Sequence, residues 1–279
     1  MSKLSFIYKN VFDSRDTLTL DAGVSVTGFT VANLAINKKS ITWRSGSSSL
    51  HRVKTTWAQN QTISGVALCF TNLVSGDSVN IKLYSDIAGT TNIYTSGNIT
   101  VTHNYDVPAG FSSVNSTSFA YGGGIHISHL LAEKTNVRRM DIEFNVSSNP
   151  AGFVEASRIV AGKYWSPERS AALGARIGFS DSTSSFRTYS GDLVTDRGSI
   201  SRTLDFNVNA MSESDKAGWN NLFRSVGKSN PFFVGIAGSS NSISEEIISG
   251  SIYGKFESDI DVSTQLFKRY GSQVRIIEL

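Results

Sequence analysis

Two pairs of carboxylates have the spacing from which a strand could build a glycosidase site. Asp141 and Glu143 stand two residues apart in an alternating segment, and Asp259 and Asp261 repeat that spacing. Residues at i and i+2 share one face of a strand, and glycoside hydrolysis needs two carboxyl groups about 5 to 10 Å apart. Acids that alternate with apolar residues are, however, typical of the wet face of any strand. We interpret both pairs as surface carboxylates, so the sequence predicts no catalytic residue and no enzyme.

The sequence contains histidine and cysteine, but their spacing does not match that of a known metal site. His126 and His129 are close, but residues three apart in a strand point to opposite faces and cannot share one ion without a bend. Cys69 is the one cysteine and lies in an apolar run, where a thiol behaves as a small buried hydrophobe. No disulfide can form within the chain, which is typical of a reducing compartment. We expect no metal and no cofactor.

Two further patterns fail as ligand motifs. Asp13, Asp16 and Asp21 do not have the spacing of an EF-hand loop, so we expect exposed turn acids. The run from Gly122 to Gly124 lacks the Gly-Lys-Ser/Thr ending of a phosphate-binding loop and predicts a flexible turn.

Aromatic residues near loops indicate the more interesting chemistry, which is sugar binding. An exposed aromatic ring can stack on the apolar face of a sugar beside polar side chains that bond its hydroxyls. Tyr105 and Tyr121 flank a long connection and are the candidate glycan-binding residues. Trp43, by contrast, is expected to pack between strands.

Composition and charge exclude several partners. The 279 residues include 26 basic and 23 acidic ones, which leaves a net charge of +3. A nucleic-acid partner is not expected, because Lys and Arg are not clustered. No apolar run reaches the ~20 residues of a membrane helix, and the first residues lack a signal-peptide core. Charged residues make up only 18% of the chain, which suits strands with one wet face.

One stretch breaks a pattern that is otherwise all-β. Ser212 to Asp215 has the form of a capping box, and Trp219, Leu222, Phe223 and Val226 follow with helical spacing. The stretch predicts one short helix, at about residues 212–227, packed through Trp219.

The strand signals divide the chain in two. Short alternating segments recur about every ten residues with turn signals between them, which is typical of sandwiches and barrels. A small polar cluster with a proline, residues 147–152, is the expected boundary. We predict two β-sandwich, jelly-roll-like domains in series, 1–150 and 151–279, with the helix in the second.

Two sets of short motifs resemble modules of tailed-bacteriophage tail proteins. The first set is similar to an N-terminal, galactose-binding-like β-sandwich, and the second to the module that commonly follows it. The resemblance covers roughly 33–97 and 158–234. The first set is Asn33-Leu34, Trp43-Arg44-Ser45, Thr71-Asn72-Leu73 and Tyr94-Thr95-Ser96-Gly97; the second includes Arg158–Gly162, Trp165-Ser166-Pro167, Ser201–Leu204 and Asn230–Phe233.

The resemblance implies a virion structural protein, a tail-tip, baseplate or fibre-associated subunit for assembly and host attachment. It would be located in the virion, assembled in the host cytoplasm, and contact other virion proteins and a host surface glycan. Homo-oligomers are expected, because viral parts reuse one interface by symmetry. The alternatives are a carbohydrate-binding receptor-recognition module and a capsid decoration or head-fibre protein.

Overall fold

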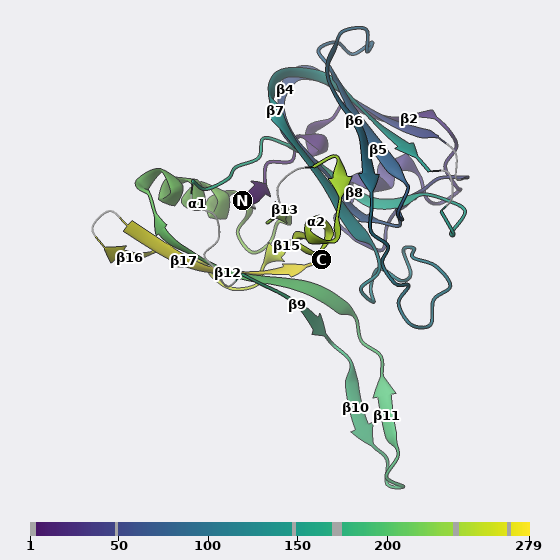
Figure 1. The fold of residues 1–279 in the computed structure, drawn as a ribbon, viewed down its shortest axis with the longest axis vertical. Coiled ribbons are helices and arrows are strands. Elements are labelled where there is room, and N and C mark those ends of the chain that lie inside the picture. The colour runs from purple at the N-terminus through teal and green to yellow at the C-terminus, as the bar shows by residue number, and fades with distance from the viewer. Residues whose placement is uncertain (1–3, 48–49, 147–148, 169–174, 237–239, 267–268) are drawn as a thin grey trace.

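The computed structural model describes residues 4–47, 50–146, 149–168, 175–236, 240–266 and 269–279. The fold is all-β, as predicted: an eight-stranded and a seven-stranded sheet lie one above the other, and a narrow two-stranded ribbon projects from them (Figure 1). Each sheet curls around its own apolar core. Neither of the two α-helices in the described residues is long and apolar enough to cross a membrane.

The eight-stranded sheet is built around two long, bent strands. β4 and β7 each run for 21 residues and pair with each other in antiparallel fashion. Their register shifts repeatedly between Thr56 and Gly65, and such bulges bend and twist a strand pair. The sheet therefore folds over its own core. In order its strands are β14 (Ser242–Ile243), β6 (Asn92–Val101), β5 (Ser78–Tyr84), β7 (Ile125–Asn145), β4 (His51–Thr71), β8 (Glu155–Gly162) and β3 (Trp43–Arg44), with β2 (Thr17–Ala22) also paired to β4.

The core of this sheet confirms two predictions. Trp43 is fully buried, with its ring 5.1 Å from that of Phe144. Cys69 lies in the central strand β4, flanked by β7 and β8, and is also fully buried. Burial raises the pKa of the Cys69 thiol, which leaves it protonated and inert as a nucleophile.

The seven-stranded sheet carries the predicted helix, α1 (Glu213–Val226), against its apolar face. The Ser212 side chain accepts a hydrogen bond from the Asp215 N–H at 3.2 Å, as a capping residue does. Trp219 is 1% exposed and its ring lies 5.2 Å from that of Phe6. The predicted helix is confirmed. In order the strands are β1 (Ser5–Ile7), β13 (Phe232–Gly235), β15 (Ser251–Phe256), β17 (Arg269–Glu278), β12 (Ile200–Met211) and β9 (Arg176–Asp181), with β16 (Ser263–Leu266) paired to β17.

Gly218 shows how the helix is fitted to its neighbour. A glycine inside a helix costs about 1 kcal/mol relative to alanine. A Cβ at this position would lie 2.5 Å from the Trp165 indole, which is closer than real contacts allow. The glycine therefore admits Trp165, whose ring is 5.4 Å from Trp219.

Helical structure is more extensive than the sequence predicted. The apolar run of residues 247–253 is typical of a strand, but α2 (Glu245–Ser249) takes up its first residues and β15 follows. Ser244 at the N-cap position and two acids in the first turn favour that helix start, and Ile248 is buried. The structure also contains two 3-10 helices, η1 (Val11–Ser14) and η2 (Val31–Ala35).

Strand pairing crosses residue 150 in both directions. β8 and β14 lie beyond the expected boundary but belong to the eight-stranded sheet, whereas β1 at the start of the chain pairs with β13. The division into domains 1–150 and 151–279 stays a prediction, and it does not follow the membership of the sheets.

The two sheets meet through apolar and ionic contacts. Ile7, Phe70 and Phe233 belong to an apolar cluster between them. Beside it, His126 Nε2 lies 2.7 Å and Arg202 Nε 3.2 Å from the Glu278 carboxylate. Burial alone would raise the pKa of Glu278, but Arg202 and His126 outweigh it and hold that pKa at about 2. The sheets are therefore held together partly by a buried charge network.

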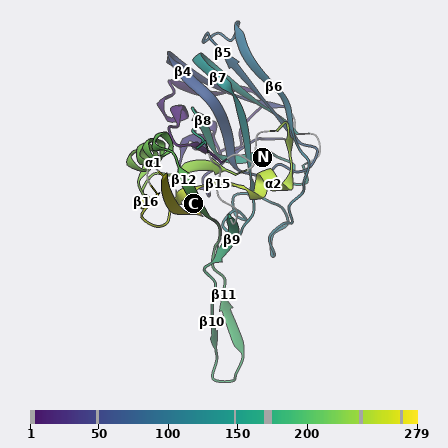
Figure 2. The same cartoon turned by 60° about the vertical axis from the view of Figure 1, so that its left-hand side comes forward.

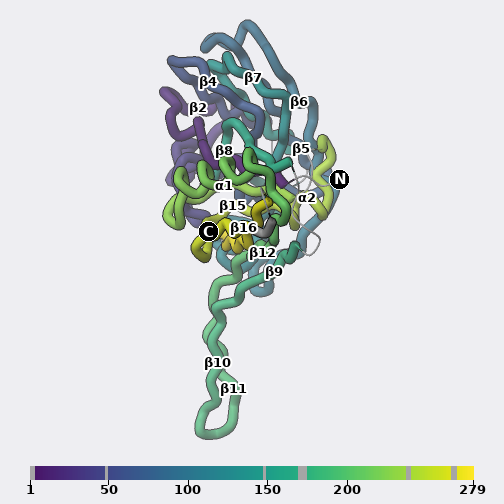
Figure 3. The backbone as a smooth tube through the Cα atoms, turned by 90° about the vertical axis from the view of Figure 1, so that its left-hand side faces the viewer, coloured from purple at the N-terminus to yellow at the C-terminus, as the bar shows by residue number. Residues whose placement is uncertain are grey.

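The ribbon consists of β10 (Ser184–Arg187) and β11 (Leu193–Asp196) and leaves the body at β9. The sequence of residues 188–196 is typical of a hairpin, and the observed hairpin begins four residues earlier, at Ser184. Figures 2 and 3 show the ribbon projecting away from both sheets. Its residues are exposed on both strands, including Phe186 and Leu193 at 59% and 60%.

Candidate functional site

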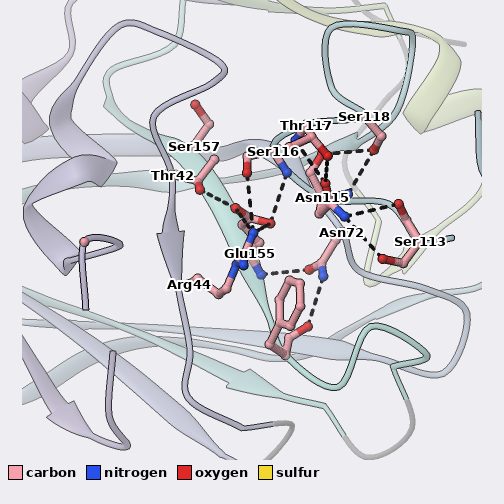
Figure 4. A network of polar contacts seen from close by, with 12 residues as sticks. Thr42, Arg44, Asn72, Ser113, Asn115, Ser116, Thr117, Ser118, Glu155 and Ser157 are labelled. Atoms are coloured by element: carbon pink, nitrogen blue, oxygen red, sulfur yellow. Dashed lines mark hydrogen bonds and ion pairs between the residues drawn. The ribbon is translucent and has the colours of Figure 1, made fainter. Parts of the chain in front are cut away.

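The long connection between β6 and β7, residues 102–124, is anchored by a buried carboxylate. Glu155 on β8 is fully buried and accepts hydrogen bonds from Thr42 Oγ1, from Arg44 Nη2 at 3.2 and 3.3 Å, and from the Ser116 backbone N–H at 3.1 Å (Figure 4). Its own N–H donates to Asn72 Oδ1 at 2.8 Å. Through Ser116, this carboxylate ties the connection to the sheet.

The guanidinium of Arg44, the cation in this network, contacts two aromatic rings. The Arg44 guanidinium lies 4.2 Å from the centroid of Phe29 and 4.3 Å from that of Phe153. Within the connection, Asn115 Oδ1 accepts from the Thr117 N–H at 2.9 Å. These hydrogen bonds and ring contacts hold Arg44 against Glu155 and fix the position of the connection on the sheet.

A cavity with a mixed polar and apolar lining opens on one side of Tyr105, in the connection that Glu155 anchors. Its volume is about 310 Å³, a typical size for a small-molecule site. Three amides and several hydroxyls face it, beside a few apolar side chains. The lining residues are Asn72, Val74, Ser75, Asn104, Tyr105, Val107, Ser112, Ser113, Val114, Asn149, Pro150 and Ala151.

A second cavity, of about 370 Å³, opens beside the same tyrosine. Tyr105 is 37% exposed and meets His103 edge-on, with the ring centroids 5.3 Å apart. Burial raises the pKa of the Tyr105 phenol, so its O–H remains a hydrogen-bond donor at neutral pH. This partly exposed ring is therefore the wall that two cavities share. The second cavity is lined by Tyr105, Gly122, Ile177, Phe179, Arg202, Glu245 and Ser249.

The structure separates the two tyrosines that the sequence placed together. The Tyr121 ring lies 5.3 Å from that of Phe111, and the Arg197 guanidinium lies 4.2 Å from its centroid. Arg197 also donates to the Ala109 carbonyl at 2.7 Å. Tyr121 therefore joins the connection to the root of the ribbon and lines neither cavity, and its role in glycan binding stays a prediction.

The carboxylate pair on β7, which we expected at the surface, is buried: Asp141 is 1% and Glu143 8% exposed. Both carboxylates are neutralised by cations. Asp141 receives two hydrogen bonds from Arg139, both of 2.7 Å, and Glu143 pairs with Arg52 and Lys82 at 2.7 and 2.9 Å. Burial alone would raise the pKa of Glu143, but the bonds from Lys82 and Arg52 lower it. A general acid needs a raised pKa, so this pair is a structural ion-pair group.

The remaining candidate acids and histidines do not converge. Asp259 and Asp261 both line a third cavity, of about 410 Å³ and separate from the two beside Tyr105, and there Asp259 pairs with Lys228 at 3.2 Å. The two histidines have different partners: His129 Nε2 lies 2.6 Å from the Tyr94 hydroxyl, and His126 Nε2 lies 2.7 Å from Glu278 Oε1. In the described ranges, no three metal-ligating side chains form a cluster. Asp13, Asp16 and Asp21 bond separately to Arg158, to the Ala58 N–H and to Arg52.

Sequence reasoning missed Glu155 and the second cavity. A signal for Glu155 existed, because a charged residue inside an otherwise apolar strand must be paired if it is buried. The second cavity gave none. Its lining comes from the connection, β9, β12 and α2, which are far apart in the sequence.

No known protein-family profile matches the chain. No curated protein matches its sequence.

Solved structures share part of the fold at low identity. The chain is similar to chitosan-binding module 1 of a chitosanase/glucanase from Paenibacillus sp. IK-5, with 16% identity over 55% of this chain and 98% of that one and a TM-score of 0.39. It is similar to the CBM32 of AlyQ in complex with 4,5-unsaturated mannuronic acid, with 19% identity, 53% and 94% coverage and a TM-score of 0.36.

A third similar structure is part of an enzyme. A GH29 fucosidase of Ruminococcus gnavus in complex with fucose matches with 11% identity over 58% of this chain and 28% of that one, at a TM-score of 0.38. These neighbours include carbohydrate-binding modules, alone or within larger chains.

Proposed function

We propose that this protein is a non-catalytic carbohydrate-binding protein whose site is built around Tyr105. The observation that supports it is one partly exposed aromatic ring between two cavities of about 310 and 370 Å³.

The chemistry of the first cavity suits a sugar. A pyranose has an apolar C–H face, which packs on an aromatic ring, and hydroxyls around its edge, which need hydrogen-bond partners. Asn104 supplies an amide group, and Ser112 and Ser113 supply hydroxyls, on the walls beside Tyr105. The amides of Asn72 and Asn149 are bonded within the protein and hold the wall in place. The anchored connection keeps these walls in place before a ligand arrives, which reduces the entropy lost on binding.

A glycan array followed by calorimetry tests this function. Tyr105→Ala is expected to lower the affinity for the best array ligand at least tenfold, because the stacking ring is lost. Tyr189→Ala is the matched control, since Tyr189 is a fully exposed tyrosine at the ribbon turn, and its binding should equal that of the wild type. Absence of any glycan ligand, or equal binding by Tyr105→Ala, would refute the proposal.

A second candidate function is that of a subunit of a phage tail tip, baseplate or fibre that assembles with its own copies and with other virion proteins. The ribbon favours it. An isolated two-stranded hairpin is marginally stable in water, and exposed apolar patches mark interaction surfaces. Phe186, Leu193 and Val194 are 59%, 60% and 40% exposed there.

Sedimentation of the purified protein tests the assembly role. The wild type is expected to form homo-oligomers, and the double variant Phe186→Ser, Leu193→Ser to sediment as a monomer while keeping its circular dichroism spectrum. A monomeric wild type would contradict self-assembly. Mass spectrometry of purified phage particles tests the virion location. Particles that lacked this chain would contradict that location. Antibody labelling of the particles would show whether the chain lies on the head or on the tail.

A further inference from the structure

The second cavity beside Tyr105 has a lining that a fully hydroxylated sugar does not require. Ile177 and Phe179 stand two residues apart on β9 and therefore face the same side. They are 42% and 69% exposed, and both line the cavity with Tyr105. A sugar hydroxyl placed against them would lose its hydration without a partner, whereas a methyl group would be stabilised there.

The opposite side of this cavity is polar and fixed. Arg202 is 5% exposed, and its guanidinium donates to the Ile248 and Gly124 carbonyls at 3.0 and 2.8 Å and pairs with Glu278. Its charge is thus neutralised and its position is set by three partners. The arginine forms a rigid wall.

Glu245 and Gly122 complete the opening. The exposed Glu245 carboxylate makes no ion pair with another of the described residues, so it is available to accept a hydrogen bond from a ligand N–H. Gly122 has a φ of +84°, which disfavours any side chain, and so the backbone lines the cavity here without a side chain.

An acetamido group matches this combination. It carries a methyl group for the apolar side and an N–H donor for a carboxylate, and it is attached directly to a sugar ring. We propose that the second cavity binds the acetamido group of an N-acetylated sugar whose ring packs at Tyr105. The inference rests on the glycan-binding function proposed above and gives that site its substrate class, N-acetylhexosamine-containing glycans.

Pairs of neutral sugars that differ only at one substituent provide the test. Binding of N-acetylgalactosamine against galactose, and of N,N′-diacetylchitobiose against cellobiose, is measured by calorimetry. The acetylated member of at least one pair is expected to bind at least tenfold more tightly. Equal affinities within both pairs would overturn the acetamido inference but leave the glycan-binding function standing. Failure of all glycans to bind would overturn both.

Variants of the cavity then assign the preference to its lining. Phe179→Ser is expected to remove most of the preference while retaining affinity for the sugar without the acetyl group, because only the apolar wall is lost. Glu245→Gln should weaken the acetylated ligand several-fold. Phe186→Ser, on the ribbon, is the matched control and should leave the preference unchanged.

The same variants separate a ligand site from a subunit contact. Phe179 is 69% exposed on an edge strand, so Phe179→Ser should fold, which circular dichroism checks. If this variant changed the sedimentation coefficient but not the sugar preference, the cavity would be a contact between copies and the inference would be wrong. An unchanged preference with unchanged sedimentation would overturn it as well.

Discussion

Replacement of Glu155 by Gln tests whether the buried network positions residues 102–124, the connection between β6 and β7. The carboxylate has two oxygens that accept from a guanidinium, a hydroxyl and a backbone N–H. Glutamine keeps one oxygen and replaces the other by an NH₂ group, which would face donors from Arg44 or Ser116. The variant thus removes the charge that pairs with Arg44 and leaves at least one buried donor without an acceptor.

The magnitude follows from the complete burial of Glu155 and from the rings that cover most of Arg44. The Glu155 side chain is 0% exposed and that of Arg44 is 22% exposed, with Phe29 and Phe153 covering its guanidinium. Breaking a buried ion pair by removing one partner typically costs about 3–5 kcal/mol. We expect Glu155→Gln to lower the free energy of unfolding by that amount.

Urea denaturation followed by circular dichroism measures this change. Glu143→Gln is the matched control, because Glu143 also meets two cations. Its partners Arg52 and Lys82 are 32% and 26% exposed in their side chains, so solvent screens the pairs and the expected loss is only about 1 kcal/mol. Glu155→Gln should also make residues 102–124 sensitive to limited proteolysis. A loss no greater than that of the control, with no new cleavage, would refute the reasoning.

Three further perturbations test the fold. Trp219→Ala should lower the free energy of unfolding by about 3–5 kcal/mol as a core truncation, measured by urea denaturation; a loss under 1 kcal/mol would contradict the packing of α1. Gly218→Ala should lower the melting temperature despite its better helix propensity, because its Cβ would strike Trp165; a rise would contradict that contact. Stability should fall in acid in two windows. Burial lowers the pKa of His126 below its ordinary value of 6.5. As the pH falls below 6.5 this histidine is therefore protonated in the unfolded chain before it is protonated in the folded one, and the folded state loses stability. The pKa of the Glu278 carboxylate falls from 4.5 to about 2 on folding, so its contribution to stability is complete above pH 4.5 and is lost between pH 4.5 and 2. The urea midpoint is measured against pH for the wild type and for Glu278→Gln. A midpoint that does not change with pH in either protein would contradict this prediction.

Much of the secondary structure could be predicted because its causes are local. The period-two segments predicted strands, and the cap at Ser212 with the apolar stripe through Trp219 predicted α1. The apolar run around Cys69 predicted a strand buried on both faces. These signals depend on residues that are neighbours in the chain, and each was confirmed.

Bounds and sheet membership could not be predicted in this way. The segments read as separate strands join into β4 and β7 because bulges let one strand bend without ending. α2 was missed because five residues are too few for a helical period to be seen against an apolar run.

The candidate site shows the same division between sequence and tertiary structure. Tyr105 was identified from the sequence because an aromatic residue in a long polar connection has no local core to enter. Its cavities, and the contact of Arg197 with the Tyr121 ring, arise only when segments that are far apart in the sequence meet. Glu155 similarly finds its donors at Thr42, Arg44 and Ser116. Local patterns determined the strands, the helix and the aromatic candidate; the fold alone decided which side chains share a cavity, because pairing and burial act between segments that the sequence does not place side by side.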